Sequence, residues 1–430
     1  MKKSIRWLSF YFSTKTVNRL KMVNVMRKWV LITGVLLMQQ AYAQKLTQWK
    51  AAESKQVNKK VLSYDLAEFQ NLPKDSLVLY EVVGDKKTPI AFQLDHFGGD
   101  QIWWRSSGNE VPENYELWKS KNESPLGDNS EISVSSNGDE LKLVFNDVPL
   151  VTYRYTTMYP PEGVDTVFKR SGFIHPLRSL SGKRLTRIQP PDHYHHYGLW
   201  NPWTKVEYKG EIVDFWNLKK KEGTVEFAGI TGINQGAVFS GYQVHHKHQL
   251  FDEHMNKETV LNELQTIRIY TPEDDADYYI MDMDIQLECA TDYPFILKEY
   301  RYGGLTIRTT EKWVKETSRV ITNETDVRNE IDGSRGDWIL IEGHDNQQWA
   351  GVGIMSNPHN FNHPQPLRVW PDNANGNGEI MANYAPSKDR DWVLEPGKTY
   401  HLKYRFFIFD GEKGRKFMDS QWEKYKSANE

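Results

Sequence analysis

Three histidines fall within four positions of one segment, at His193, His195 and His196, directly after Asp192. Imidazole rings titrate near neutral pH, carry protons and ligate metals, so their clustering points to chemistry. Two prolines open the segment, which predicts a loop that follows an extended stretch and does not start a helix. The alternative is a structural loop with exposed histidines, although a turn needs only one such polar ring.

Proton transfer is the role that we expect for His195 or His196, with Tyr302 as the partner in acid–base catalysis. Tyr302 is followed by two glycines that lead into a predicted strand, and glycines let a backbone and a ligand approach closely. Arg308, at the end of this strand, is expected to clamp a substrate carboxylate, because a guanidinium binds a carboxylate through two hydrogen bonds. Arg301 precedes the strand, and an exposed position on a sheet face is an equal alternative for it.

Aromatic and charged residues close to these motifs are expected to bind the substrate. Tryptophans offer flat apolar faces on which a sugar ring can stack. Two of the tryptophans follow an aspartate by one or two positions, which places a carboxylate beside an aromatic ring. The residues expected in this role are His193, Arg187, Trp200, Asp214, Trp216, Asp337, Trp338 and His359.

A divalent metal is a second use for the histidines. If the segment is extended, His193 and His195 share one face, and such a His-x-His pair can ligate a metal with Asp192 completing the shell. His359 and His363 occupy a proline-rich loop and are further candidates. The spacing of the histidines alone does not decide whether a metal is bound, and the sequence points to no organic cofactor.

The elements that must position these residues are predicted to be almost entirely β. Ten segments, of which residues 278–287 are typical, are rich in β-branched and aromatic residues and often alternate between apolar and polar. Only residues 412–428 have a helical pattern, with Phe417, Trp422 and Tyr425 on one face. Many strands without alternating helices predict a large antiparallel β-sandwich with a short C-terminal helix.

Composition narrows the class of protein. A net charge of -3 gives no reason to expect nucleic acid as a partner. Aromatic residues make up 13% of the chain, which suits a carbohydrate-handling surface, although an aromatic core accounts for most of them. The single cysteine, Cys289, excludes a disulfide framework. The histidine-rich tract at residues 245–248 lies in a strand-like segment and is interpreted mainly as a solvated strand.

The N-terminal region predicts export. A charged stretch at residues 26–28, an apolar stretch at residues 29–38 and small residues at positions 41–43 form a signal peptide, with cleavage expected before Gln44. We therefore expect a secreted or periplasmic protein without a membrane span. The expected divisions are residues 1–43 as the removed N-terminus, 44–120 as a β segment that is separate or part of the sandwich, 121–411 as the catalytic β-sandwich, and 412–430 as the helix.

Several motifs occur in one order between about residues 150 and 412, at residues 176–182, 192–200, 214–216, 302–308, 336–338, 351–360, 402–405 and 410–411. In these motifs the chain resembles the family labelled "methane oxygenase PmoA", a domain of unknown function. The oxygenase label does not follow, because a membrane copper oxygenase needs spanning helices. The resemblance implies a secreted bacterial protein of carbohydrate-degrading systems, with a β-sandwich similar to the galactose-mutarotase supersandwich.

The residues favour a lyase or dehydratase that acts by β-elimination on uronate-containing oligosaccharides. Removal of a proton next to a carboxylate needs a base, an acid for the leaving group and a positive charge on the carboxylate, and the motifs supply all three. A glycoside hydrolase, which usually needs two facing carboxylates, or a mutarotase-like epimerase is an alternative. A non-catalytic sugar-binding protein is another. The expected partner is the oligosaccharide, and the oligomeric state is left open.

Overall fold

The computed structural model describes residues 43–58, 60–66, 77–95, 97, 101–106, 112–120, 130–273 and 275–429. The signal peptide expected in residues 26–43 lies outside the described residues up to position 42, so cleavage before Gln44 stays a prediction. The chain divides into two compact units. Strands from the region before residue 121 contribute to both units, as described below.

The smaller unit contains one four-stranded antiparallel sheet in the order β1-β8-β4-β5. Alternate apolar side chains such as Leu77, Leu79 and Leu117 are fully buried. On this sheet Glu116 forms ion pairs with Lys45 at 3.4 Å and with Lys87 at 2.7 Å. The strands are β1 (Ala43–Lys50), β4 (Leu77–Val83), β5 (Lys86–Ile90) and β8 (Asn114–Ser120).

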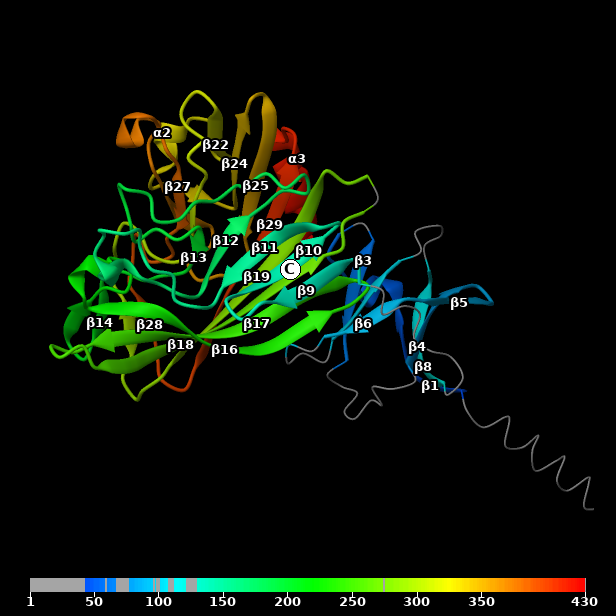
Figure 1. Cartoon of the computed structure of the whole chain (residues 1–430). Helices are drawn as coiled ribbons and strands as arrows, with labels where there is room; N and C mark the ends of the chain where they lie inside the picture. Colours follow the sequence, from blue (N-terminus) through cyan, green and yellow to red (C-terminus); the bar gives the residue numbers. More distant parts are fainter. Residues whose placement is uncertain are drawn as a thin grey trace, which may run out of the picture. The chain divides into compact units, whose positions relative to one another are not determined.

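The larger unit is built on two large antiparallel sheets (Figure 1). The first has nine strands in the order β23-β26-β27-β21-β13-β12-β11-β10-β9. These strands are β9 (Ile132–Ser136), β10 (Glu140–Phe145), β11 (Val148–Arg154), β12 (Phe173–Leu177), β13 (Leu199–Trp200), β21 (Thr306–Arg308), β23 (Arg335–Gly336), β26 (Gln365–Val369) and β27 (Met381–Tyr384).

The second large sheet has eight strands in the order β16-β17-β18-β19-β29-β25-β24-β22. They are β16 (Gly223–Gln235), β17 (Phe239–Phe251), β18 (Lys257–Tyr270), β19 (Tyr278–Cys289), β22 (Ser318–Thr322), β24 (Trp338–Asp345), β25 (Gln348–Ser356) and β29 (Thr399–Asp410).

Two small sheets and the helices complete this unit. One small sheet has the order β2-β3-β7-β6 and the other β15-β14-β20-β28. Their strands are β2 (Lys55–Gln56), β3 (Val61–Asp65), β6 (Phe92–Leu94), β7 (Gln101–Arg105), β14 (Val206–Tyr208), β15 (Glu211–Val213), β20 (Phe295–Leu297) and β28 (Trp392–Leu394). The helices are α2 (Arg328–Ile331), α3 (Gly414–Ser427) and the 3-10 turns η1 (Ala51–Glu53), η2 (Thr166–Phe168), η3 (Leu218–Lys220) and η4 (Ala374–Gly376).

Strand β19 shows how the sequence produces this sandwich. Its residues Met281, Met283 and Ile285 are buried in the core that the two large sheets share, while Ile280 belongs to a second cluster on the opposite face of the eight-stranded sheet. Side chains of a strand alternate between faces, so an apolar residue at every second position commits one face to the core. The predicted all-β antiparallel sandwich is confirmed.

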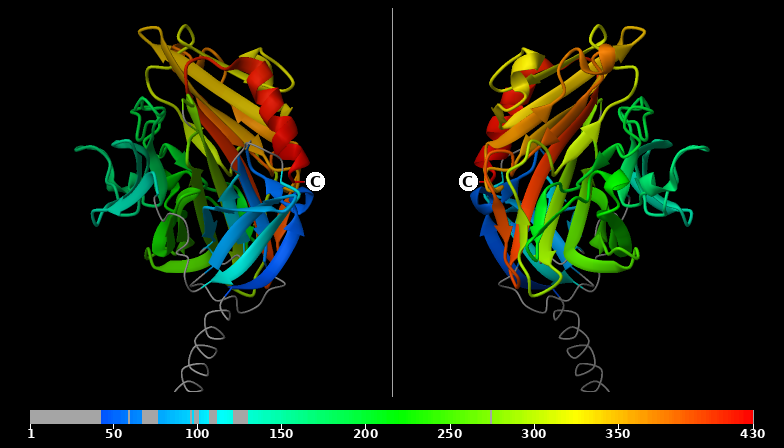
Figure 2. Two further views of the ribbon diagram at one scale, coloured as in Figure 1. Left: turned by 90° about the vertical axis from the view of Figure 1, so that its right-hand side faces the viewer. Right: turned by 90° about the vertical axis from the view of Figure 1, so that its left-hand side faces the viewer.

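Helix α3 covers part of the outer face of the eight-stranded sheet. Met418, Trp422 and Tyr425 are its buried residues, a spacing that forms one stripe of a helix. Both views in Figure 2 show α3 lying against strands of the eight-stranded sheet, and the helix packs against β24. Phe417, which the sequence placed on the buried face, lies at the flank of the stripe and is partly buried.

Membrane crossing by a helix was not expected from the hydropathy pattern. In the described parts of the chain, no helix is long and apolar enough to span a bilayer.

Candidate functional site

The three clustered histidines lie on a loop between β12 and β13. The backbone N–H of His193 bonds to the carbonyl of Pro190 at 2.9 Å, and that of His196 bonds to the carbonyl of His193 at 3.0 Å. The segment therefore consists of two successive turns, and the extended geometry assumed for a His-x-His pair is wrong. The ring centroids of His193 and His196 are 4.7 Å apart, and those of His195 and His196 are 4.8 Å apart.

Gly198 fixes the base of this loop. Its φ is +64°, and a Cβ here would lie 2.4 Å from the carbonyl oxygen of Ile174, so only glycine fits. The N–H of Gly198 bonds to the carbonyl of Arg187 at 3.0 Å, and its own carbonyl accepts the N–H of Arg308 at 2.7 Å. The histidine loop is thus tied to strand β21.

The histidines form one wall of a cavity of about 300 Å³, at the small end of ligand pockets. Residues of β26 and β27 and the segments before β21 and η3 form the other walls. Two guanidiniums reach the cavity, and among the described residues no carboxylate lines it. The lining residues are His193, His195, His196, Trp216, Asn217, Arg301, Tyr302, Arg368, Trp370 and Met381.

The three imidazoles differ in their environments. Burial lowers the pKa of His195 to about 4, and the neighbouring His193 and Arg170 add to this effect. Burial likewise holds the pKa of His196 well below its usual value. Its side chain is 2% exposed, and its Nδ1 has no partner among the described residues. Both rings are therefore neutral at neutral pH and can accept a proton or a hydrogen bond.

His193 is oriented by a carboxylate. Its Nδ1 lies 2.7 Å from Oδ2 of Asp192, which also accepts hydrogen bonds from Arg308 at 3.0 Å and from Asn375 at 2.7 Å. Burial would raise the pKa of Asp192, but the bond from His193 and the charge of Arg308 outweigh burial and hold it well below its usual value. An ionised carboxylate only accepts, so Nδ1 of His193 carries the proton and Nε2 is the acceptor.

Arg308 lies in an ionic network behind the histidine loop and does not line the cavity. Its side chain is 0% exposed and meets two protein carboxylates, those of Asp192 and Glu379. Arg187 also pairs with Glu379. This placement does not support the expected substrate clamp at Arg308 or substrate contact by Arg187, because neither residue lines the cavity and both are paired with carboxylates of the protein. Their position supports a different role, that of holding Asp192 and the loop in place.

Asp214 is connected to Tyr302 by hydrogen bonds through the side chain of Asn217. Its Oδ1 accepts the backbone N–H groups of Trp216 at 2.9 Å and Asn217 at 2.8 Å, and its Oδ2 accepts the side-chain amide of Asn217 at 2.7 Å. Asn217 in turn donates to the phenolic oxygen of Tyr302 at 3.1 Å. Lys220 pairs with Asp214 at 2.9 Å. Asp214 is therefore a buried support for the cavity wall, and it does not contact the cavity.

Aromatic rings pack behind the histidines on two sides. Trp200 is buried, with its ring 5.4 Å from those of His196 and Trp216, and it lines no part of the cavity. Trp370 lies 4.8 Å from the ring of His193 and carries the guanidinium of Arg308 at 4.3 Å from its centroid. Trp216 and Trp370 are thus the two tryptophans among the residues that line the cavity.

The two glycines before β21 approach protein atoms. A Cβ on Gly304 would lie 2.9 Å from the carbonyl oxygen of Tyr384 and 3.2 Å from Trp203. A Cβ on Gly303 would lie 3.4 Å from the hydroxyl of Thr204. Close packing against protein atoms therefore accounts for Gly304, whereas the contacts at Gly303 are ordinary, and its role in ligand approach stays a prediction.

Three predicted substrate-binding residues lie away from the cavity, close to α3. Asp337 pairs with His363 at 3.2 Å. Trp338 is fully buried in the cluster that includes residues of α3. Nε2 of His359 lies 2.7 Å from the carbonyl of Asn429, beyond the end of α3. None of the three lines the cavity.

Five lining residues were absent from the predicted site. Asn217 follows Asp214 by three positions, which is an Asx-turn signal that the sequence does offer. Arg301 was left undecided between the site and an exposed sheet face. Arg368, Trp370 and Met381 carry no local signal, because they reach the cavity only through the pairing of β26 and β27.

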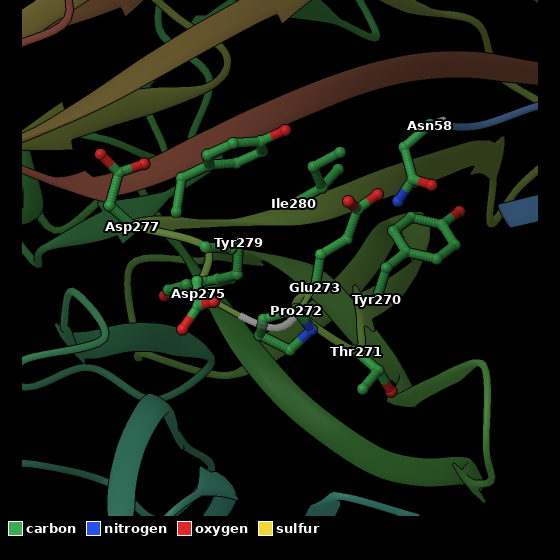
Figure 3. A pocket seen from close by; sticks show the side chains of 11 residues that line it. Asn58, Tyr270, Thr271, Pro272, Glu273, Asp275, Asp277, Tyr279 and Ile280 are labelled. Atoms are coloured by element: carbon green, nitrogen blue, oxygen red, sulfur yellow. The ribbon is translucent and has the colours of Figure 1, made fainter. Parts of the chain in front are cut away.

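Among the described residues, no group of three His, Cys, Asp or Glu side chains is placed so that it could hold a metal ion. A second cavity of about 300 Å³ contains Glu273, Asp275 and Asp277. Figure 3 shows these three carboxylates spread apart and pointing in different directions. This second cavity has no imidazole or guanidinium among its lining residues, so we do not treat it as a catalytic site.

A second group of titratable side chains is buried inside the sandwich. Glu263 accepts from Nδ1 of His246 at 3.0 Å, from Nε2 of His248 at 3.0 Å and from Asn201 at 3.1 Å. Nε2 of His246 then accepts the hydroxyl of Tyr153 at 2.6 Å. Both histidines are at most 2% exposed. The interpretation of residues 245–248 as a solvated strand is therefore wrong, because alternation places His246 and His248 together on the core face.

The comparisons with known proteins give a family but no activity. The chain belongs to a family of unknown function, DUF6807, whose pattern matches residues 140–423. No curated protein matches the sequence. A solved structure named "Putative kojibiose phosphorylase from human microbiome" is similar at 11% identity and a TM-score of 0.27, over 69% of this chain. The chain spans about a third of the length of that protein, and a likeness of this size carries no argument about the reaction.

Proposed function

We propose that this protein is a carbohydrate-active lyase or dehydratase that acts by β-elimination on a uronate-containing oligosaccharide. The observation that carries the proposal is the composition of the cavity wall, which combines three imidazoles, a phenol and two guanidiniums without a carboxylate among the described residues. Neutral bases and cations suit an anionic sugar. They suit a neutral sugar less well, because its binding needs acceptors for many hydroxyl groups.

The proposed reaction begins at the carbon next to the substrate carboxylate. His195 takes the proton from this carbon, because its lowered pKa keeps the ring neutral and no described residue bonds to its nitrogens. The electron pair of the broken C–H bond forms a carbon–carbon double bond, and the bond from the neighbouring carbon to the leaving oxygen breaks. Tyr302 gives its phenolic proton to that oxygen; burial raises its pKa, so it is protonated at neutral pH. His196 is the alternative base.

The buried residues around the cavity hold these groups in position. Asp192 fixes the ring of His193, which leaves Nε2 of His193 to accept a hydrogen bond from a sugar hydroxyl. Arg308 holds Asp192 from behind. Asn217 donates to the oxygen of Tyr302, and Tyr300 forms a further hydrogen bond with the same hydroxyl, so both neighbours fix its position.

The other candidate activities fit the cavity less well. A glycoside hydrolase usually needs two carboxylates that face the scissile bond, whereas the carboxylates of Asp192 and Asp214 are turned to protein partners. An epimerase needs only an acid and a base, and a sugar-binding protein needs neither. Both differ from the proposed reaction in their products.

Product mass and ultraviolet absorbance test the proposal together. The protein is incubated with a panel of uronate oligosaccharides, and the products are separated and weighed. New absorbance from an unsaturated uronate, with fragments whose masses add up to that of the substrate or with loss of water, supports elimination. Gain of water without new absorbance would establish hydrolysis instead, and retention of the sugar without any product would establish binding alone.

Export to the periplasm or the medium is part of the same proposal. The segment at residues 26–43 has the composition of a signal peptide. N-terminal sequencing of the protein from its native host should find Gln44 or a close neighbour as the first residue. An intact terminus at Met1 or Met26 in the exported fraction would contradict the assignment.

A further inference from the structure

The guanidiniums around the cavity differ in whether the protein already neutralises them. Arg187 and Arg308 share the carboxylates of Asp192 and Glu379, so two cations face two anions. Burial raises the pKa of Glu379, but Asn375 and the two arginines outweigh it and hold the carboxyl ionised. This group is balanced in charge and offers little attraction to a ligand.

A second group of basic residues, two of which line the cavity, carries an excess of positive charge. Arg368 pairs with Asp332 at 2.5 Å, and Lys388 pairs with the same carboxylate at 3.1 Å. Lys388 also donates to the carbonyl oxygen of Arg301 at 3.1 Å, which ties the three basic residues together. In the described residues no carboxylate lies within ion-pair distance of Arg301. Arg368 and Lys388 thus share the carboxylate of Asp332, and Arg301 adds a positive charge that no carboxylate of the described residues compensates.

Arg301 is held in place although it has no anionic partner. Its guanidinium lies 5.3 Å from the ring centroid of Tyr302 and 5.9 Å from that of Tyr300. Arg301 also donates hydrogen bonds to the side chains of Tyr302 and Tyr300, and these contacts restrict the exposed side chain. Arg301 lines the cavity beside Tyr302, the proposed proton donor. A guanidinium has five N–H donors, so those that the two tyrosines leave over can bind a carboxylate.

We propose that Arg301 is the specificity-determining residue of the cavity and selects sugars that carry a carboxylate. Arg368 supports the same wall but is partly satisfied by Asp332. The inference rests on the proposed function, which places the reacting part of the sugar beside Tyr302. The preference of Arg301 for a carboxylate can be measured without any turnover. It places the substrate carboxylate on the wall that carries Tyr302 and away from the balanced network of Arg308.

The experiment compares charged and neutral forms of one ligand. Calorimetry measures the binding of a glucuronate or galacturonate disaccharide and of its carboxyl-reduced counterpart, which differs only at the carboxylate. Arg301→Gln removes the charge and Arg301→Lys keeps it. We expect wild type to prefer the uronate, Arg301→Gln to lose on the order of ten- to hundred-fold in uronate affinity, as for a charged hydrogen bond, and Arg301→Lys to retain part of the preference. The neutral sugar should bind equally to all three.

Arg390→Gln is the matched control, because Arg390 is an exposed arginine that lines no described cavity and pairs with Asp389 at 3.4 Å. Thermal melting of each variant checks that the fold is intact. Equal affinity of wild type for both sugars, no binding of either sugar, or an Arg301→Gln variant with unchanged preference would overturn the inference.

Turnover separates this inference from the proposed function. Uronate binding that depends on Arg301 without any elimination product would support the inference and refute the proposed reaction. Elimination by wild type that Arg301→Gln leaves unchanged would overturn the inference and leave the proposed reaction standing. Where turnover is found, a drop in kcat/KM for the uronate that Arg301→Lys partly restores would support the assignment.

Discussion

Replacing Glu263 tests the physical account of the buried network inside the sandwich. Glu263→Leu keeps a similar volume, so the main loss is the acceptor that His246, His248 and Asn201 share. Each buried donor left without a partner costs about 1–3 kcal/mol, and removing one member of a buried charged group typically costs about 3–5 kcal/mol. We therefore expect the free energy of unfolding at pH 7 to fall by about 3–5 kcal/mol, a large part of the stability of an ordinary domain.

The lowered pKa of Glu263 determines how its contribution to stability depends on pH. Burial raises this pKa, but the bonds from His246 and His248 outweigh burial and lower it from 4.5 to about 2. At about 1.4 kcal/mol per pKa unit, this difference corresponds to about 3 kcal/mol. Because the folded-state pKa is the lower one, the stabilisation is complete above about pH 5 and is lost as the pH falls toward 2.

Urea unfolding followed by tryptophan fluorescence at pH 7 and pH 3 measures both effects. The difference between wild type and Glu263→Leu should be smaller at pH 3 than at pH 7. Glu226→Leu is the matched control, because Glu226 forms an exposed pair with Lys257 at 2.6 Å on the same sheet, and such pairs contribute about 0–1 kcal/mol. A Glu263→Leu variant within about 1 kcal/mol of wild type, or a penalty that does not change with pH, would refute the reasoning.

Three further predictions concern the cavity and the helix. On a substrate confirmed by product mass, His195→Ala should lower kcat by about 10²–10⁴ with an unchanged melting temperature, and full activity of both His195→Ala and His196→Ala would show that the cluster is structural. The kcat/KM profile should lose activity below about pH 4, because protonated His195 accepts no proton, and a limb near pH 6.5 would contradict this. Deleting α3 should lower the melting temperature by exposing Met418, Trp422 and Tyr425, without abolishing turnover; loss of turnover at unchanged stability would contradict that role.

Local periodicity was sufficient to predict the fold class and the C-terminal helix. Alternation in residues 278–287 predicted β19, and the apolar spacing of residues 412–428 predicted α3 at Gly414–Ser427. The order of strands was not accessible in the same way. For example, β29 pairs with β19 on one side and β25 on the other, across long stretches of chain. Such pairing depends on which faces bury together in three dimensions, and each strand's own pattern is compatible with many partners.

The candidate site was predictable where its residues are neighbours in sequence. His193, His195 and His196 gather through two local turns, and a cluster of polar rings can be recognised without a fold. Arg368 and Trp370 come to the cavity because β26 pairs with β27 and β27 with β21, which no local motif records. Asp337, Trp338 and His359 were expected in the cavity for the same reason, because no local motif records which strands lie beside it.

The separation of charges between two layers supports the proposed preference of the cavity for an anionic ligand. Carboxylates are present near the histidines, but Asp192, Glu379 and Asp214 lie behind the surface of the cavity and are bonded to protein donors. In that position they orient His193 and Asn217 and hold the arginines without repelling a negative ligand. A carboxylate on the wall would repel a uronate and would also compete for Arg301. Because these carboxylates are bonded to protein donors, the wall itself is left to neutral bases and cations, and this distribution connects the proposed β-elimination with the proposed selection of a carboxylate by Arg301.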